Sequence, residues 1–180
     1  MRYIWDLKDD YRRRIPWPLR PLWDLQATAL RAWDRSTVQG VDLFMANSIN
    51  VQKRIWANYR RESIVVYPPV HTDFFVLDPE IPREDYFVYV GHLSSYKRPY
   101  DLLSLASSGF FPLKVAGTGA GMSRLVRAAQ GLPIEFLGRV DDEEVRRLLQ
   151  GARGLLFPGE EDFGMVPVEA MACGTPVIAL

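Results

Sequence analysis

The second half of the chain alternates short apolar runs with helix-like segments, and this feature most limits the possible folds. Strands are predicted near residues 86–90, 113–116, 134–137, 154–157 and 176–179, with helices at 98–106, 121–129, 142–151 and 166–173. Such alternation is typical of βαβ units, which form a parallel sheet covered by helices. The helix at 142–151 has a clear start, since Asp141 can cap it and Glu144 follows three residues later. Gly151 is expected to close it.

Residues 1–70 are less regular. After a proline-rich stretch, the pattern predicts a helix at 22–36, a strand at 42–46, a helix after Ser48 and a strand at 63–67. This order favours the end of another α/β sheet. Prolines 68 and 69 cannot donate ladder hydrogen bonds and end the last strand. We therefore predict three parts: the C-terminal part of one domain (1–70), an interdomain linker (71–84) and a second, α/β domain (85–180).

Composition narrows the function classes. The 180 residues carry 22 basic and 22 acidic side chains, so no overall charge favours nucleic acid as a partner. Residues 1–70 nevertheless hold 12 basic and 7 acidic side chains, and residues 71–180 hold 10 and 15. The single cysteine, Cys173, excludes an internal disulfide and fits a cytoplasmic location.

One acidic loop follows the predicted strand at 154–157 and leads into a helix. Glu161 and Glu169 flank Phe-Gly-Met-Val-Pro in this segment. Ligands of open α/β sheets bind at the carboxyl ends of the strands. Backbone amides of the first helical turn, those of Gly164, Met165 and Val166, would suit a diphosphate. A solvated acidic loop that only caps the helix is the alternative.

Two further loops leave strands at the same edge. Gly91-His92-Leu93-Ser94-Ser95-Tyr96-Lys97-Arg98 brings two cations there, and Lys97 could neutralise a departing phosphate. A basic loop without function is the alternative. The glycine-rich turn at 116–121 matches only half of a dinucleotide-binding pattern, which is weak support for a site.

Together these motifs resemble one family, the retaining glycosyltransferases of family 4 (group 1), which have the GT-B fold of two Rossmann-like domains. The matching segments are Glu161 to Glu169, Glu-Ala-Met-Ala-Cys-Gly-Thr-Pro at 169–176, Phe-Leu-Gly-Arg-Val at 136–140 and the loop at 91–98. In residues 1–70, Arg-Tyr-Ile-Trp-Asp, Ala-Asn-Ser and Tyr-Pro-Pro-Val look like the acceptor domain of mannosyltransferase-like members. The fold implied is α/β: a partial N-terminal Rossmann-like domain, then most of a C-terminal donor-binding domain with a parallel sheet.

The resemblance also implies roles for individual residues. Lys97 and Glu161 would be catalytic: Lys97 would hold the donor diphosphate, and Glu161 would contact the transferred sugar. Glu169 would bind the ribose hydroxyls, and Arg139 and Val140 would lie against the base. The remaining donor-binding residues would be Gly91, His92, Arg98, Phe163, Gly164, Met165 and Val166. Family members usually carry arginine at position 92, whereas histidine has little charge at neutral pH.

The implied co-substrate is a nucleotide sugar, GDP-mannose first and a UDP-sugar second, with no metal or other cofactor; the absence of an Asp-x-Asp motif fits this. The acceptor would be a glycan or a lipid-linked saccharide. Arg12, Arg13 and Arg14 together with Trp5, Trp17, Trp23 and Trp33 could contact the inner face of a membrane, although a helix with basic residues outside and tryptophans inside explains them equally well.

Two alternatives stay open at this stage. One is a related GT-B enzyme such as a phosphorylase or epimerase, and the other is a non-catalytic fragment that binds a nucleotide sugar or a partner. Against the family, 180 residues is about half of what two Rossmann domains need. We therefore expect an internal fragment that exposes apolar surface and associates when expressed alone.

Overall fold

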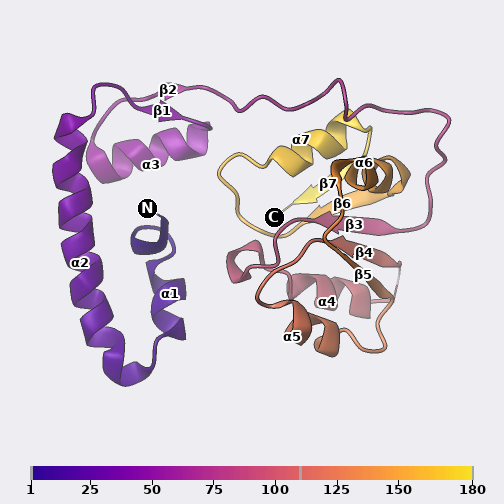
Figure 1. Cartoon of the computed structure of the whole chain (residues 1–180), viewed down its shortest axis with the longest axis horizontal. Helices are drawn as coiled ribbons and strands as arrows, with labels where there is room; N and C mark the ends of the chain where they lie inside the picture. The colour runs from indigo at the N-terminus through magenta and orange to yellow at the C-terminus, as the bar shows by residue number, and fades with distance from the viewer. Residues whose placement is uncertain (1, 110, 180) are drawn as a thin grey trace. The chain divides into compact units, whose positions relative to one another are not determined.

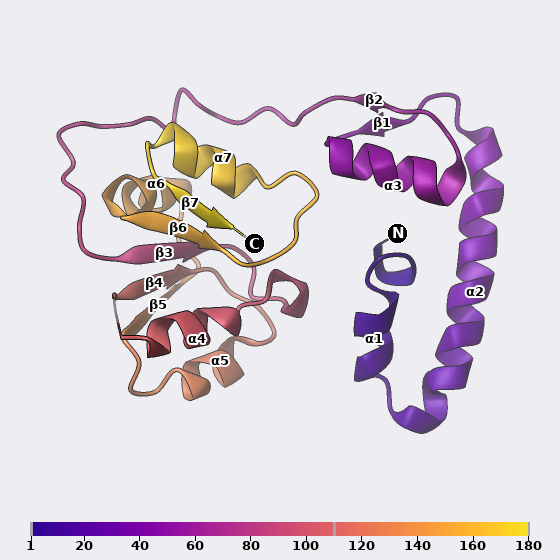
Figure 2. The same cartoon turned by 180° about the vertical axis from the view of Figure 1, so that it is seen from behind.

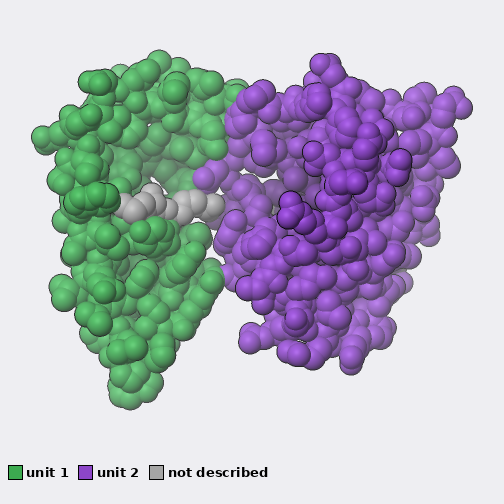
Figure 3. Space-filling model, in the orientation of Figure 1, with its two compact units in different colours: residues 1–67 green, residues 68–180 purple. Residues whose placement is uncertain are grey.

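The computed structural model describes residues 2–109 and 111–179. The chain divides into two compact units, Met1–Tyr67 and Pro68–Leu180, which Figure 3 colours separately. Within the described residues no helix is both long enough and apolar enough to span a bilayer.

The second unit is built on a five-stranded parallel sheet (Figure 1). Its strand order is β5-β4-β3-β6-β7, and every adjacent pair is parallel. The chain runs outward from β3 through β4 to β5 and then returns to place β6 on the other side of β3. The direction of winding therefore reverses between β3 and β6, which is where open α/β sheets form their ligand crevice. The strands are β3 (Phe87–Val90), β4 (Leu113–Ala116), β5 (Ile134–Gly138), β6 (Gly154–Phe157) and β7 (Val177–Ala179).

Helices cover both faces of this sheet, as Figures 1 and 2 show. On one face lie α4 (Asp101–Ser107) and α5 (Met122–Ala128), and on the other lie α6 (Asp142–Gly151) and α7 (Met165–Ala172). Successive strand residues point to opposite faces, so Val88 joins the α6–α7 core while Tyr89 joins the α4–α5 core. This arrangement confirms the predicted α/β class with a parallel sheet.

One helix in this unit begins later than predicted, and another ends at the predicted residue but for a different reason. Helix α4 begins at Asp101 rather than at residue 98, because Arg98 has left-handed backbone angles (φ 52°) and Pro99 follows it. Asp141 does cap α6, accepting a hydrogen bond from the Glu144 amide at 2.9 Å. Gly151, however, is not a left-handed cap: it is the last residue of α6, and the chain leaves it extended at Ala152. The reason for glycine there is space, since a Cβ would lie 2.7 Å from the Tyr86 hydroxyl.

The first unit combines a helical hairpin with a small βαβ unit. The hairpin is α1 (Lys8–Arg14) and α2 (Arg20–Thr37), and the βαβ unit is β1 (Met45–Ala46), α3 (Ile49–Tyr59) and β2 (Ile64–Val65), with β1 and β2 parallel. Ser48 caps α3 through the Val51 amide. Helix α1 was not predicted, although acids in its first turn and arginines in its last complement the helix dipole. Short 3-10 helices are η1 (Arg2–Ile4), η2 (Trp17–Leu19), η3 (Val38–Gly40) and η4 (Ser95–Lys97).

The segment 71–84, predicted as an interdomain linker, packs on the second unit. Phe75 is buried in the α6–α7 core, and Gln150 donates a hydrogen bond to the Val76 carbonyl at 2.8 Å. The Arg83 guanidinium binds backbone carbonyls at the ends of α6 and α7, those of Leu149 and Gly174 among them. Phe75 and Arg83 thus anchor a segment that was predicted as a linker from its lack of periodicity.

Candidate functional site

Two loops meet at the carboxyl edge of the sheet, one after β3 and one after β6. Gly159, in the second loop, lies against the backbone of the first: a Cβ at this position would stand 2.7 Å from the Lys97 Cα. Only glycine permits this approach without displacement of one loop. The contact lies at the reversal point of the sheet and brings the acidic loop beside the basic one.

Lys97 and Glu161 form an ion pair across these loops, from the lysine Nζ to the glutamate Oε1. Their side chains are only 19% and 22% exposed, so water screens the pair less than it would a surface pair. The sequence proposed both residues as catalytic, and the structure brings them together.

Tyr89 supports the loop that carries Lys97. Its ring is buried in the α4–α5 core, and its hydroxyl donates a hydrogen bond to the His92 carbonyl at 3.3 Å. Burial, followed by the charge of Glu161, raises the pKa of Tyr89 well above its usual range. The phenol therefore remains a neutral donor, and it is a supporting residue that the sequence reading did not find.

A pocket of about 290 Å³ opens at the carboxyl ends of β3, β4 and β5. It takes in four residues predicted from the sequence, and its lining is Val90, Gly91, His92, Ala116, Gly117, Thr118, Arg139, Val140 and Val145. The turn at 116–121, which matches only half of a dinucleotide-binding pattern, thus supplies part of the pocket wall. Hydrogen bonds from Gly91 to the Ala116 carbonyl and from Leu93 to the Thr118 carbonyl hold this turn against the loop after β3.

The start of α7 adds backbone donors near the acidic loop. Gly164 is the residue before the helix and has left-handed backbone angles (φ 82°), which glycine adopts without strain. The amides of Met165 and Val166 lie in the first turn, where helices have no internal acceptors. The Met165 side chain is exposed, the Val166 side chain packs on the α6–α7 core, and Phe163 is partly buried.

Glu169 lies one turn further along α7 and is partly buried. Burial raises its pKa above the ordinary value, and the charge of Asp142 at the start of α6 adds to this effect. Arg98, in contrast, is exposed and pairs with Asp101 at 2.6 Å. The structure therefore does not join Arg98 to the Lys97–Glu161 pair.

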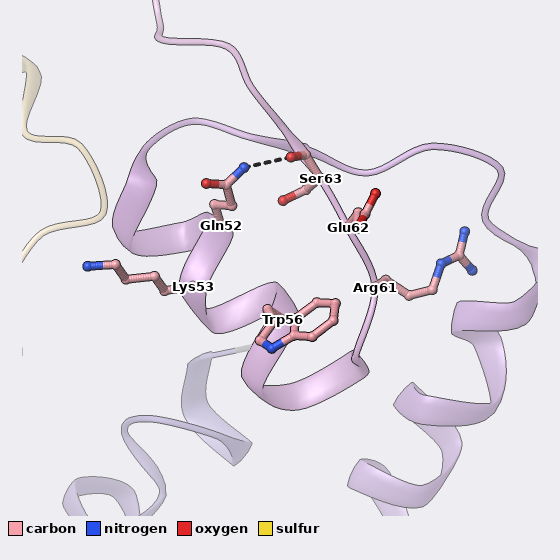
Figure 4. Close-up of a pocket in the computed structure, with 6 residues that line it drawn as sticks. All are labelled: Gln52, Lys53, Trp56, Arg61, Glu62 and Ser63. Atoms are coloured by element: carbon pink, nitrogen blue, oxygen red, sulfur yellow. Dashed lines mark hydrogen bonds between the residues drawn. The ribbon is translucent and has the colours of Figure 1, made fainter.

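The first unit has a larger hollow, of about 490 Å³, between α3 and the residues before β2 (Figure 4). Trp56 and Glu62 line it, and Gln52 is tied to the Ser63 carbonyl at 2.7 Å. Arg61 is already bound to the Val38 and Val41 carbonyls. None of the residues predicted for the site lies here, so size alone does not mark the site.

Comparison with known proteins agrees with this geometry. The family model described as "Glycosyl transferases group 1" matches residues 77–180, which contain the whole sheet and both loops of the ion pair. The chain belongs to this family.

Relatives with known names are glycosyltransferases. A GDP-mannose-dependent alpha-(1-6)-phosphatidylinositol dimannoside mannosyltransferase of Mycobacterium tuberculosis is 40% identical over 104 residues, 54% of this chain and 27% of the relative. The D-rhamnosyltransferase WbpZ of Pseudomonas aeruginosa is 33% identical over 52% of this chain and 26% of its own length. A D-inositol 3-phosphate glycosyltransferase of Mycobacterium sp. is 34% identical over 64% of this chain and 31% of its own length. The match thus spans about a third or less of the length of each of these relatives.

Solved structures show the same fold. Sucrose-phosphate synthase from Thermosynechococcus elongatus matches with a TM-score of 0.71 at 20% identity, over 83% of this chain and 43% of that one. HepE of Anabaena, solved with UDP and glucose, matches with a TM-score of 0.65 at 22% identity, over 77% and 44%. At these identities the likeness concerns the fold, and it supports the GT-B type of α/β architecture.

Proposed function

We propose that this group 1 chain is part of a retaining, metal-independent glycosyltransferase of family 4 that transfers mannose from GDP-mannose to a saccharide or a lipid-linked saccharide. The observation that carries the proposal is the Lys97–Glu161 pair at the reversal point of the sheet. The name of the M. tuberculosis relative supports GDP-mannose as the donor. A UDP-sugar is the second choice, because HepE was solved with UDP.

The ion pair supplies the two groups that the reaction needs. A departing nucleoside diphosphate gains negative charge, which the Lys97 ammonium and the first-turn amides of α7 would stabilise. The Glu161 carboxylate would accept hydrogen bonds from hydroxyls of the transferred sugar and so orient its anomeric carbon. Before the donor arrives, each side chain holds the other in place, so little ordering is required when the diphosphate replaces the carboxylate as the partner of Lys97.

The remaining donor contacts follow from the pocket and α7. Arg139 and Val140, just after β5, would lie against the base, and His92, which lines the same pocket, would lie near the phosphates. Glu169 would accept hydrogen bonds from the two ribose hydroxyls, for which it must be ionised. Arg98 would act only after release from Asp101.

The proposed donor and acceptor also indicate where in the cell the protein would act. The donor is a cytoplasmic metabolite, so we place the protein in the cytoplasm, and a lipid-linked acceptor would bring it to the inner face of the membrane. The proposed reaction involves no nucleic acid. No further cofactor is included in the proposal.

Donor binding and nucleoside diphosphate release test the proposal. We expect calorimetric binding of GDP-mannose and slow GDP release, with UDP-glucose weaker in both. Lys97→Ala and Glu161→Ala should each lower the rate of release by roughly 100-fold or more, since each removes a group that acts on developing charge or on the sugar. Glu160→Ala is the matched control, because this neighbouring glutamate is exposed; its rate should stay within about threefold of wild type.

Other results would change the assignment. Release by Glu161→Ala equal to that of wild type would remove Glu161 from the site. Donor binding without release by the wild-type chain, with the acceptor supplied, would favour the non-catalytic alternative.

A further inference from the structure

The turn between α1 and α2 presents large apolar side chains to solvent. Trp17 is 78% exposed, and Leu19 and Leu22 are each 54% exposed. We call residues 16–22, which contain these three side chains, the apolar tip. It lies at the end of the helical hairpin farthest from β1 and β2 in both Figure 1 and Figure 2. Contiguous apolar side chains on a surface commonly mark an interaction site.

The tip is stiff for an exposed turn. Prolines at positions 16, 18 and 21 fix the φ angle at three of its seven residues, and Trp17–Leu19 form a 3-10 turn. The Arg20 side chain donates a hydrogen bond to the Ile15 carbonyl at 3.2 Å and closes the turn. A stiff tip loses little conformational entropy when it inserts into a partner.

The surroundings of the tip favour a negatively charged partner. Arg13 and Arg14 precede it and Arg20 lies within it, and the Arg13 side chain is 74% exposed although it contacts Asp10. The unit as a whole has 12 basic against 7 acidic side chains. Tryptophan and leucine side chains next to arginine are typical of segments that lie at the interface of anionic membranes.

The structure separates Trp17 from Trp5 and Trp23, two of the tryptophans that the sequence grouped with it, whereas Trp33 is also exposed (58%). Trp5 donates a hydrogen bond to Asp34 at 2.7 Å and has the guanidinium groups of Arg31 and Arg35 on its ring. Trp23 stacks on Tyr11 with ring centroids 6.4 Å apart. Both serve the packing of the hairpin, whereas Trp17 has no such packing.

We propose that the apolar tip inserts into the interface of an anionic lipid membrane, with Trp17, Leu19 and Leu22 among the acyl chains and Arg13 and Arg14 at the phosphates. This rests on the proposed function in one respect, because a lipid-linked acceptor gives the contact its purpose. Membrane binding can nevertheless be measured without turnover.

The experiment is co-sedimentation of the whole chain with vesicles of equal parts phosphatidylglycerol and phosphatidylcholine, and with phosphatidylcholine alone. We expect binding to the anionic vesicles, weaker at high salt, and a loss of roughly tenfold or more in Trp17→Ser/Leu19→Ser. Arg13→Gln/Arg14→Gln should lose the preference for anionic lipid. Trp56→Ser is the matched control, since Trp56 is an exposed tryptophan of the same unit, and its binding should equal that of wild type.

The inference is wrong if the wild-type chain does not sediment with anionic vesicles, or if Trp17→Ser/Leu19→Ser sediments equally well. It is also wrong if the wild type is a dimer that this variant converts to a monomer, because the tip would then bind a second copy of the chain. GDP-mannose binding is measured in parallel. A tip variant that binds the donor but not vesicles supports membrane binding by the tip. A wild-type chain that binds vesicles but no donor contradicts only the proposed function.

Discussion

At the scale of single residues, the proposed ribose contact of Glu169 comes at a cost in stability. Burial, and then Asp142, raise its pKa above the ordinary 4.5, so the folded protein holds the proton more tightly than the unfolded chain. Ionised Glu169 therefore costs stability at neutral pH, and this cost disappears as the pH falls through the raised pKa toward 4.5. Glu169→Gln should raise the melting temperature at pH 7.5 by roughly 2 °C and weaken donor binding. A pH series of thermal melts, with exposed Glu160→Gln as control, checks this; a gain that persists unchanged at pH 4 would contradict it.

At the scale of elements, Arg83 ties the ends of α6 and α7 to the segment before the sheet. Its guanidinium donates to the carbonyls of Leu149, in the last turn of α6, and of Ala152, just after it, and to the Cys173 and Gly174 carbonyls after α7. Arg83→Met should lower the free energy of unfolding of this unit by about 2 kcal/mol, because carbonyls near the ends of both helices lose donors. Urea unfolding followed by circular dichroism measures it. Arg153→Met, which removes only an exposed pair with Asp85, should change stability by about 0.5 kcal/mol or less.

At the scale of the whole molecule, the two units differ in how well they are packed. Among the residues that the structure describes, both buried clusters of apolar side chains belong to the second unit, whereas all five tryptophans lie in the first. We expect tryptophan fluorescence to report unfolding at a lower temperature than circular dichroism at 222 nm, which follows the helices of both units. Coincident transitions by both probes would show that the units unfold together.

The apolar side chains of Met45, Ile64 and Ile178 are exposed, so we expect the chain to self-associate at high concentration.

The sequence alone determined the α/β class, the approximate strands and helices of the second unit, and the family. These depend on local information: period-2 and period-3.6 patterns, a capping aspartate at 141 and motifs of contiguous residues. It also placed Lys97 and Glu161 on loops that leave strands at the same edge, because parallel strands end together. The sequence did not predict helix α1, because its seven residues include two acids and three arginines and carry no apolar stripe.

Only the tertiary structure decided which of these residues meet. Strand order is a long-range property, so the sequence did not place β6 beside β3 or bring Gly159 against Lys97. Nor did it show that Arg98 turns to Asp101, that segment 71–84 packs on the second unit through Phe75, or that Trp17 is exposed while Trp5 is bound to Asp34. Each of these depends on contacts between residues far apart in the chain or on the direction of one side chain, and periodicity specifies neither.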